Sequence, residues 1–132
     1  MSEHKNRGVS VDGVILRGKT ILLIKRGNDP FKGYWALPGG YVDWNETTEE
    51  AVAREVMEET GLKVISAKLT GVYSSPDRHP KQVINLAYFV ETIGEPQAAD
   101  DALEFKWFPI AELPSDLAFD HNKIIRDSLP LG

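Results

Sequence analysis

Six glutamates lie within residues 46–59, where Arg54 is the single basic residue. They are Glu46, Glu49, Glu50, Glu55, Glu58 and Glu59. Residues three and four apart share one face of an α-helix, so Glu55, Glu58 and Glu59 project together and repel one another. Clustered carboxylates suit a hard divalent cation, because magnesium and calcium prefer oxygen ligands. The spacing therefore predicts a metal site on these three side chains.

An ordinary ladder of ion pairs explains part of this pattern. Glu50, Arg54 and Glu58 are spaced by four, which is typical of a solvated helix face. The same reading leaves Glu55 and Glu59 without a basic neighbour, since Lys63 lies beyond Gly61. Spacing alone therefore does not decide between a metal site and a solvated helix face.

The carboxylates require a helix, and the flanking residues supply both of its ends. Thr47 and Glu50 form a capping-box pattern and Gly61 is a carboxyl-terminal stop, which predicts a helix over 48–60. Before it, Pro38, Gly39 and Gly40 predict an exposed backbone that another group approaches closely. Apolar and turn-forming residues predict strands at 9–17, 20–26, 63–75, 82–92 and 105–108 and a second helix at 120–128.

The segment from Gly40 to Leu62 resembles the signature of the Nudix hydrolases. Five residues separate Gly40 from Glu46, seven more lead to Arg54, and the run Arg54–Leu62 follows. Every fixed position agrees, and the capping box and glycine stop predict the helix independently. The resemblance implies a single domain over residues 1–132 with an α/β/α sandwich and a mixed β-sheet. It also implies hydrolysis of a nucleoside diphosphate linked to another group.

The resemblance assigns roles residue by residue. Glu55, Glu58 and Glu59 match metal-binding glutamates, and the Gly39 carbonyl matches a backbone metal ligand. The cation is expected to be Mg²⁺, with Mn²⁺ as a possible substitute. Arg54 matches an arginine that holds the glutamates in place.

Two further roles follow from the same resemblance. Glu46 matches a supporting carboxylate beside the arginine. The general base is expected to be Glu58 or Glu59, and the alternatives on a distal loop are Asp100, Asp101 and Glu104.

Residues outside the signature indicate the substrate. The run 29–42 resembles the Nudix subgroup that cleaves ADP-ribose to AMP and ribose 5-phosphate, as does Pro76 with the Asp77–Pro80 segment that follows it. We expect Arg26 and Arg78 to contact the ribose or phosphate and Trp35 to contact the base. Softer candidates for the same contacts are Lys32, Phe31, Tyr34 and Tyr41.

Three other functions remain open at this stage. One is removal of oxidised nucleoside triphosphates, which a comparison of substrates separates from ADP-ribose cleavage. Another is a non-catalytic regulator that binds a nucleotide sugar, although the glutamates are intact. The last is an acidic helix that only binds calcium or a basic partner. Resemblance to the ADP-ribose subgroup also predicts a homodimer.

The composition of the chain argues against several partners and ligands. A net charge of −5 over 132 residues argues against nucleic acid as a partner, because phosphate backbones are bound mostly by Lys and Arg. No apolar run reaches the ~20 residues needed to cross a bilayer, and no signal peptide is evident, so we expect a cytoplasmic protein without a membrane partner. Cysteine is absent, which excludes thiolate ligands. The separated His4, His79 and His121 are expected to face solvent.

Overall fold

The amino-terminal strand divides between two sheets in the computed structural model, which describes residues 5–97 and 104–129. The expected strand 9–17 becomes β1 (Val9–Val14) and β2 (Leu16–Arg17), and the return strand is β3 (Thr20–Lys25). β1 pairs with β5 and β7, whereas β2 pairs with β3. Apolar residues continue through the division, so the sequence pattern does not mark where the chain changes sheets.

The remaining strands complete one mixed sheet and one antiparallel sheet. Their bounds are β4 (Trp35–Ala36), β5 (Gly39–Tyr41), β6 (Lys63–Tyr73), β7 (Ile84–Ile93) and β8 (Phe105–Pro109). The first sheet has the order β5-β1-β7-β6, in which β1 and β7 are parallel and the other pairs antiparallel. In the second sheet β3 pairs with β2, β4 and β8. The strand predictions are confirmed, with ends that differ by a few residues.

The expectation for the Pro38–Gly40 backbone is half wrong. The expected exposure is wrong, because Pro38 is buried and Gly39 and Gly40 are partly buried in β5, which pairs with β1. The close approach is confirmed, because a Cβ on Gly39 would lie 2.1 Å from the Val11 carbonyl oxygen. A Cβ on Gly40 would lie 2.6 Å from the Glu55 carboxylate. Glycine at both positions therefore allows the helix and β1 to pack against β5.

Helix α1 (Thr48–Thr60) has the predicted ends. The Thr47 side chain accepts a hydrogen bond from Glu50 N–H, and the Glu50 side chain accepts one from Thr47 N–H. Gly61 adopts a left-handed conformation with φ 75° and donates its N–H to the Met57 carbonyl. Helix α2 (His121–Ser128) begins one residue later than expected, and two short 3₁₀ helices, η1 (Pro76–Arg78) and η2 (Ile110–Glu112), were not predicted.

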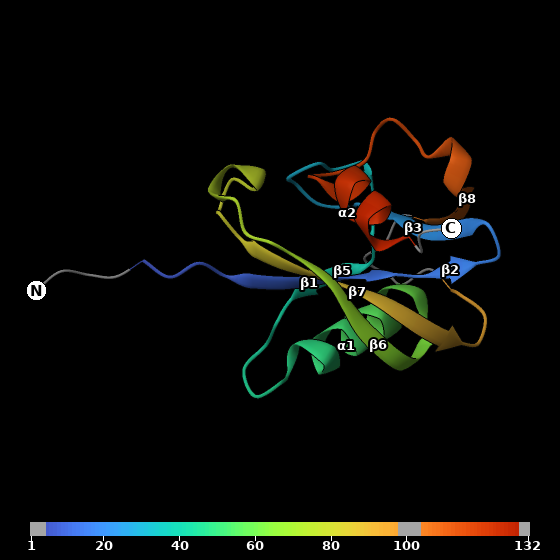
Figure 1. Cartoon of the computed structure of the whole chain (residues 1–132), viewed down its shortest axis with the longest axis horizontal. Helices are drawn as coiled ribbons and strands as arrows, with labels where there is room; N and C mark the ends of the chain where they lie inside the picture. The colour runs from blue at the N-terminus through green and yellow to red at the C-terminus, as the bar shows by residue number, and fades with distance from the viewer. Residues whose placement is uncertain (1–4, 98–103, 130–132) are drawn as a thin grey trace, which may run out of the picture.

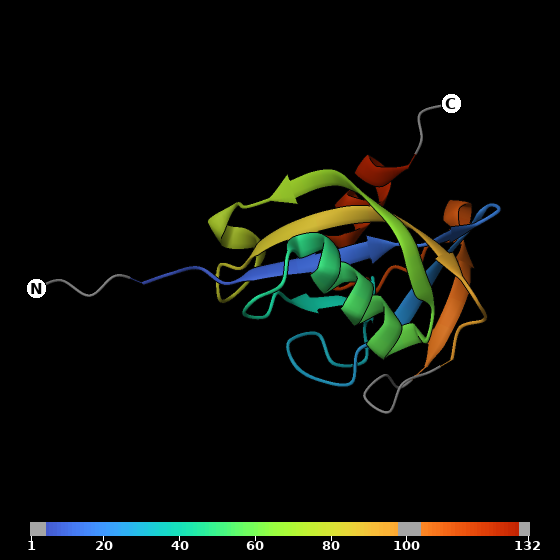
Figure 2. The same cartoon turned by 90° about the horizontal axis from the view of Figure 1, so that it is seen from below.

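The two α-helices cover opposite faces of the mixed sheet (Figures 1 and 2). Val52 and Val56 of α1 pack against Val11 of β1 in one core. Ile124 and Ile125 of α2 belong to a second core on the other face. The fold is the expected α/β/α sandwich, and it brings residues of β1, β5 and both helices together at one end of the sheet.

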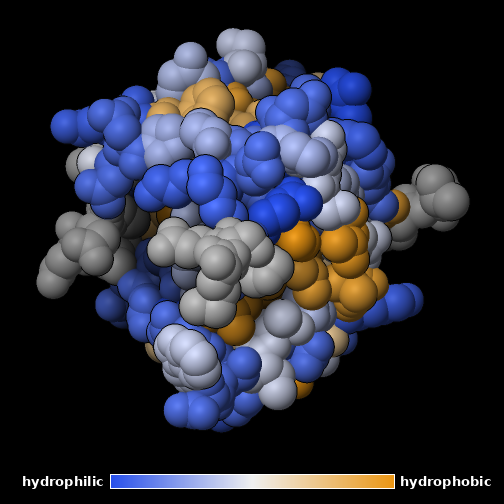
Figure 3. Space-filling model, turned by 90° about the vertical axis from the view of Figure 1, so that its left-hand side faces the viewer, coloured by the Kyte–Doolittle hydropathy of each residue, from blue (hydrophilic) through white to orange (hydrophobic). Residues whose placement is uncertain are grey.

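The surface carries apolar as well as charged side chains. On the face shown in Figure 3, apolar side chains gather in patches within a mainly hydrophilic surface. Ile65, Leu69 and Val72 of β6 are each about half exposed. Within residues 5–97 and 104–129, the helices are too short or too polar to span a bilayer.

Candidate active site

Arg54 joins α1 to the loop that precedes it. Its Nε and Nη2 donate to the two carboxylate oxygens of Glu46, at 3.0 and 2.7 Å, and Nη2 also donates to the Tyr41 carbonyl at 2.9 Å. These hydrogen bonds from Arg54, helped by one from the Asp43 N–H, lower the pKa of Glu46 to about 2. Such a two-point contact fixes the guanidinium plane and holds the loop against the helix.

The opposite end of the guanidinium contacts two of the predicted metal ligands. Nη1 lies 2.7 Å from Glu55 Oε1 and 3.3 Å from Glu58 Oε2. The Glu55 side chain is 14% exposed and the Glu58 side chain 58%. Arg54 therefore orients Glu55 in a shielded position, while Glu58 stays largely in solvent.

Glu59 lies under the β5 backbone. Its Oε1 accepts a hydrogen bond from the Gly39 N–H at 3.0 Å. Burial, together with the adjacent Glu55 carboxylate, raises the pKa of Glu59. Each of two neighbouring carboxylates in a shielded site disfavours the ionised form of the other, and Arg54 compensates the charge at Glu55.

The donor chemistry of this cluster fits a divalent cation. A cation beside Glu55 and Glu59 would favour the ionised form of both, and oxygen donors are what Mg²⁺ and Ca²⁺ prefer. Over the part of the chain that the structure describes, three or more acidic or histidine side chains do not converge on one point. Glu58 differs from the other predicted ligands in its exposure, although it shares Arg54 Nη1 with Glu55.

A cavity of about 200 Å³ adjoins the carboxylates. Its wall includes Gly39 and Gly40 of β5, the two residues that contact Glu59 and closely approach Glu55. Basic side chains line another part of the wall, among them Arg26 and Arg78. None of Glu55, Glu58 and Glu59 lines this cavity: Glu55 and Glu59 adjoin it through Gly39 and Gly40, and the acidic side chains of its wall are Asp12 and Asp29.

Arg26 and Arg78 occupy different situations in this wall. Nε of Arg26 donates to the Pro30 carbonyl at 2.8 Å, and within the described residues its Nη1 and Nη2 make no hydrogen bond. Arg78 donates through Nε and Nη2 to Asp120, at 2.9 and 2.7 Å, and through Nη1 to the Val83 carbonyl. Arg26 therefore retains free donors for a ligand, whereas Arg78 fastens the wall itself.

Phe119 is a cavity residue that the sequence analysis missed. Its ring stacks on His79 at a centroid distance of 4.9 Å, and the Arg26 guanidinium lies 5.1 Å from the same ring. Its backbone has φ 51°, a conformation rare for a bulky residue. A lone phenylalanine before a helix carries no sequence signal for this role.

The expectation of solvent-facing histidines is wrong for two of the three. His121 is 4% exposed and accepts a hydrogen bond from the Leu37 N–H, and His79 is half-buried against Phe119. His4 lies outside the described residues. The groups that bury the His121 ring come from distant parts of the chain, so local sequence does not indicate them.

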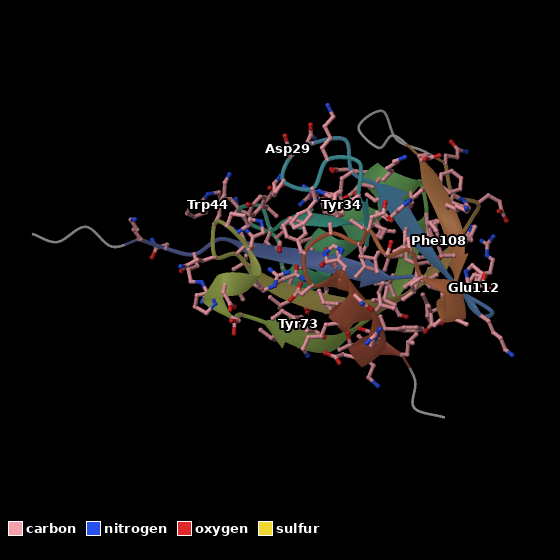
Figure 4. The ribbon with its side chains drawn as sticks, turned by 90° about the horizontal axis from the view of Figure 1, so that it is seen from above. Asp29, Tyr34, Trp44, Tyr73, Phe108 and Glu112 are labelled. Carbon is pink, nitrogen blue, oxygen red and sulfur yellow. The ribbon has the colours of Figure 1, made fainter. Side chains whose placement is uncertain are left out.

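Of the other residues predicted to contact the substrate, some line the cavity and some do not. Tyr41 lines the cavity and is 49% exposed. Trp35 lies apart from the cavity, where its ring packs edge-on against Phe108 at 4.9 Å. Figure 4 shows Tyr34 and Asp29 on the loop between β3 and β4, and of these two Asp29 reaches the cavity wall.

Of the three distal acidic residues, Glu104 is the one that lies within the described part of the chain. Glu104 lies 3.4 Å from the Lys25 ammonium, at the edge where β3 and β8 pair. Asp100 and Asp101 lie outside the described residues. The alternative base positions therefore stay predictions.

Comparison with known proteins agrees with this arrangement. The NUDIX domain model matches residues 6–128. A protein of Methanocaldococcus jannaschii named ADP-ribose pyrophosphatase is 55% identical over 121 residues, which cover 90% of this chain and 71% of that protein.

Two solved structures extend the similarity to the whole fold. A MutT NUDIX hydrolase from Burkholderia pseudomallei superposes with a TM-score of 0.87 at 32% identity, covering 95% of this chain and all of that one. The NUDIX domain of Shewanella oneidensis NrtR, solved with ADP ribose, superposes at 0.83 with 27% identity, covering 95% and 88% of the two chains. With its signature residues on α1 and β5, this chain belongs to the Nudix hydrolase family.

Proposed function

We propose that this Nudix hydrolase cleaves the diphosphate of ADP-ribose to AMP and ribose 5-phosphate, with Mg²⁺ as the cation and Mn²⁺ as a substitute. The observation that carries the proposal is the cavity in which free donors of Arg26 face the backbone beside Glu55 and Glu59. The Methanocaldococcus relative named ADP-ribose pyrophosphatase supports this substrate.

The metal-binding residues in this proposal are Glu55, Glu58, Glu59 and the Gly39 carbonyl. When bound there, Mg²⁺ supplies neutralisation of the phosphate oxygens and a lower pKa for the attacking water. Arg54 keeps Glu55 and Glu58 oriented, and Glu46 keeps Arg54 oriented. Loss of such supporting contacts typically weakens metal affinity.

The chain's own groups then carry out binding and proton transfer. Arg26 holds the diphosphate or the attached phosphate oxygens through Nη1 and Nη2. Water attacks one phosphorus, the bond from that phosphorus to the bridging oxygen breaks, and the water proton passes to Glu58 or Glu59. Phe119, His79 and Tyr41 supply the aromatic wall for the nucleotide.

Three further features belong to the same proposal. Arg78 supports the substrate cavity through its pair with Asp120, whereas Trp35 packs on Phe108 outside the cavity and is not assigned a contact with the base. We expect the enzyme to act as a homodimer, to be cytoplasmic and to use neither nucleic acid nor a membrane as partner. Light scattering tests the dimer.

A nucleotide panel assayed with Mg²⁺ tests the substrate. ADP-ribose, oxidised dGTP and other nucleoside diphosphate derivatives are compared by kcat/KM, and the products are identified after reaction in ¹⁸O-labelled water. We expect AMP and ribose 5-phosphate, with the label in one of the two phosphates. A preference for oxidised dGTP with release of pyrophosphate would contradict the proposal, and ligand binding without any turnover would indicate a regulator instead.

A further inference from the structure

Three buried polar side chains form a cluster outside the Nudix signature. Asp12 on β1, Asn85 on β7 and His121 on α2 are 6%, 1% and 4% exposed, and all three line the cavity. Burying such groups is unfavourable unless each finds hydrogen-bond partners. Their contacts therefore indicate what holds this part of the cavity together.

The three side chains are connected through one carboxylate oxygen. Asn85 Nδ2 donates to Asp12 Oδ2 at 2.6 Å, and His121 Nε2 lies 3.2 Å from the same oxygen. Asn85 is oriented in turn by Ser10, whose hydroxyl donates to Asn85 Oδ1 at 2.7 Å. Asp12 thus accepts a hydrogen bond from β7 and lies in close contact with the His121 ring of α2.

His121 also contacts the backbone on the far side of its ring. The Leu37 N–H donates to His121 Nδ1 at 3.0 Å. Because Nδ1 accepts this bond, the ring proton is on Nε2, the nitrogen that lies 3.2 Å from Asp12 Oδ2. His121 therefore bridges the Asp12 carboxylate and the Leu37 amide.

The bridge ends two residues before Gly39. The Pro38 carbonyl accepts the Gly13 N–H at 2.8 Å, and the Gly39 N–H is bound by Glu59. Asp12 pairs with Gly39 in the β1–β5 register. Each of the three residues from Leu37 to Gly39 therefore makes a backbone hydrogen bond. The bond at Leu37 is the one that comes from α2, through His121.

We propose that His121 is a positioning residue, which fixes the Leu37–Gly39 backbone and so holds the Gly39 carbonyl in the place where it would serve as a ligand to the divalent cation. This inference rests on the proposed function, because it takes Gly39 as a metal ligand. It extends the active site from the signature helix to the start of α2.

Two substitutions at His121 each remove one of its two contacts, the one to Asp12 or the one to Leu37. In His121→Asn, the shorter side chain keeps an acceptor near the Leu37 N–H and loses contact with Asp12. In His121→Gln, the longer side chain reaches Asp12 and leaves the Leu37 N–H without its acceptor. Mn²⁺ alone is the probe, titrated by calorimetry into the full chain, and kcat and KM for ADP-ribose are measured alongside.

Ser128→Ala is the matched control at the other end of α2. It removes the Ser128 hydroxyl contact to Thr70 at 2.9 Å, a partly buried hydrogen bond remote from Leu37. We expect His121→Gln to raise the Kd for Mn²⁺ about tenfold, in the range typical of supporting contacts, with His121→Asn and Ser128→Ala within about twofold of the wild type. Loss of kcat should exceed any change in KM in His121→Gln.

Other results overturn the inference. If His121→Gln binds Mn²⁺ as the wild type does, or if His121→Asn weakens binding equally, the Leu37 contact does not position the ligand. Ring ¹⁵N NMR of the wild-type protein needs no variant and is expected to show the proton of His121 on Nε2; a proton on Nδ1 excludes the bridge. Failure of the wild type to cleave ADP-ribose would contradict the proposed function, while the Mn²⁺ and NMR measurements still test His121.

Discussion

Arg54 and Arg78 are both held by carboxylates, yet their surroundings arise in different ways. Arg54 binds Glu46, Glu55 and Glu58, which lie at most eight positions away along the chain. Arg78 binds Asp120, which is 42 positions away. One cluster is produced by a single helix and its preceding loop, and the other by the docking of η1 against α2.

The difference is also functional. The Arg54 cluster leaves carboxylates beside the cavity in which Arg26 has free donors, so it can take part in chemistry. In the Arg78 cluster each of the three guanidinium nitrogens donates a hydrogen bond within the protein. The first cluster should therefore control turnover and metal affinity, and the second should control stability.

The largest expected effect is on turnover. Glu59→Gln keeps an acceptor for the Gly39 N–H and removes the negative charge, so kcat for ADP-ribose should fall about a hundredfold or more, as should kcat in Glu58→Gln. Glu50→Gln on the same helix is the control, since glutamine also completes a capping box. Full activity in both variants would refute the role of these carboxylates.

A smaller effect is expected from Arg54. Arg54→Gln removes the positive charge that orients Glu55 and Glu58, and supporting contacts of this kind are typically worth about 10- to 100-fold in metal affinity. Calorimetric titration with Mn²⁺ measures the change. Unchanged affinity would mean that the glutamates hold their places without the arginine.

Arg78 should affect stability rather than metal binding. Arg78→Gln leaves the partly buried Asp120 carboxylate without its charged partner, which we expect to cost about 2 kcal/mol in the free energy of unfolding. Denaturant unfolding measures the loss. The comparison of the two clusters fails if this variant keeps wild-type stability but loses Mn²⁺ affinity.

Arg26 allows a comparison with Arg78 within the same cavity. Arg26→Gln should raise the KM for ADP-ribose about tenfold with a smaller change in kcat, because its free donors are available to the ligand in the ground state. Steady-state kinetics with the wild type and Arg78→Gln as references test this. An equal rise of KM in both variants would show that the two arginines share one role.

The smallest effect concerns pH. Burial alone favours the neutral form of Asp120, but the hydrogen bonds and charge of Arg78 outweigh it and lower the pKa of Asp120 below its ordinary value. The pair therefore stabilises the fold above about pH 4, where an unfolded aspartate is ionised, and this contribution is lost as the pH falls further. Thermal unfolding at pH 5 and pH 3 should show a smaller acid loss in Asp120→Asn than in the wild type.

Much of the fold could be predicted from local pattern. Helix α1 has both predicted ends, because the capping box and Gly61 act within one turn of the residues they terminate. The division of the first strand between two sheets could not be predicted, since Ile15 is as apolar as its neighbours and buried between them. Only the pairing of β1 with β7 and of β2 with β3 shows where the chain turns away.

The candidate site also contains residues whose roles the sequence predicted and residues whose roles it did not. The contacts of Arg54 with Glu46 and Glu55 agree with the family resemblance, and its contact with Glu58 agrees with the spacing of four residues. The roles of Phe119 and His121 had no signal, because a phenylalanine or histidine in a polar segment is compatible with an exposed surface. Arg78 was assigned to the substrate from its charge, and its pairing with Asp120 depends on a partner distant in sequence.

By itself the sequence determined the signature helix, its cluster of carboxylates and the family. Helical periodicity and capping depend on residues only a few positions apart, so these features can be predicted from local sequence. The tertiary structure decided which arginine keeps free donors, which histidine is buried and which backbone lies against Glu59. Those properties depend on burial and hydrogen bonding between segments far apart in the chain, which pair only when the sheets and helices pack.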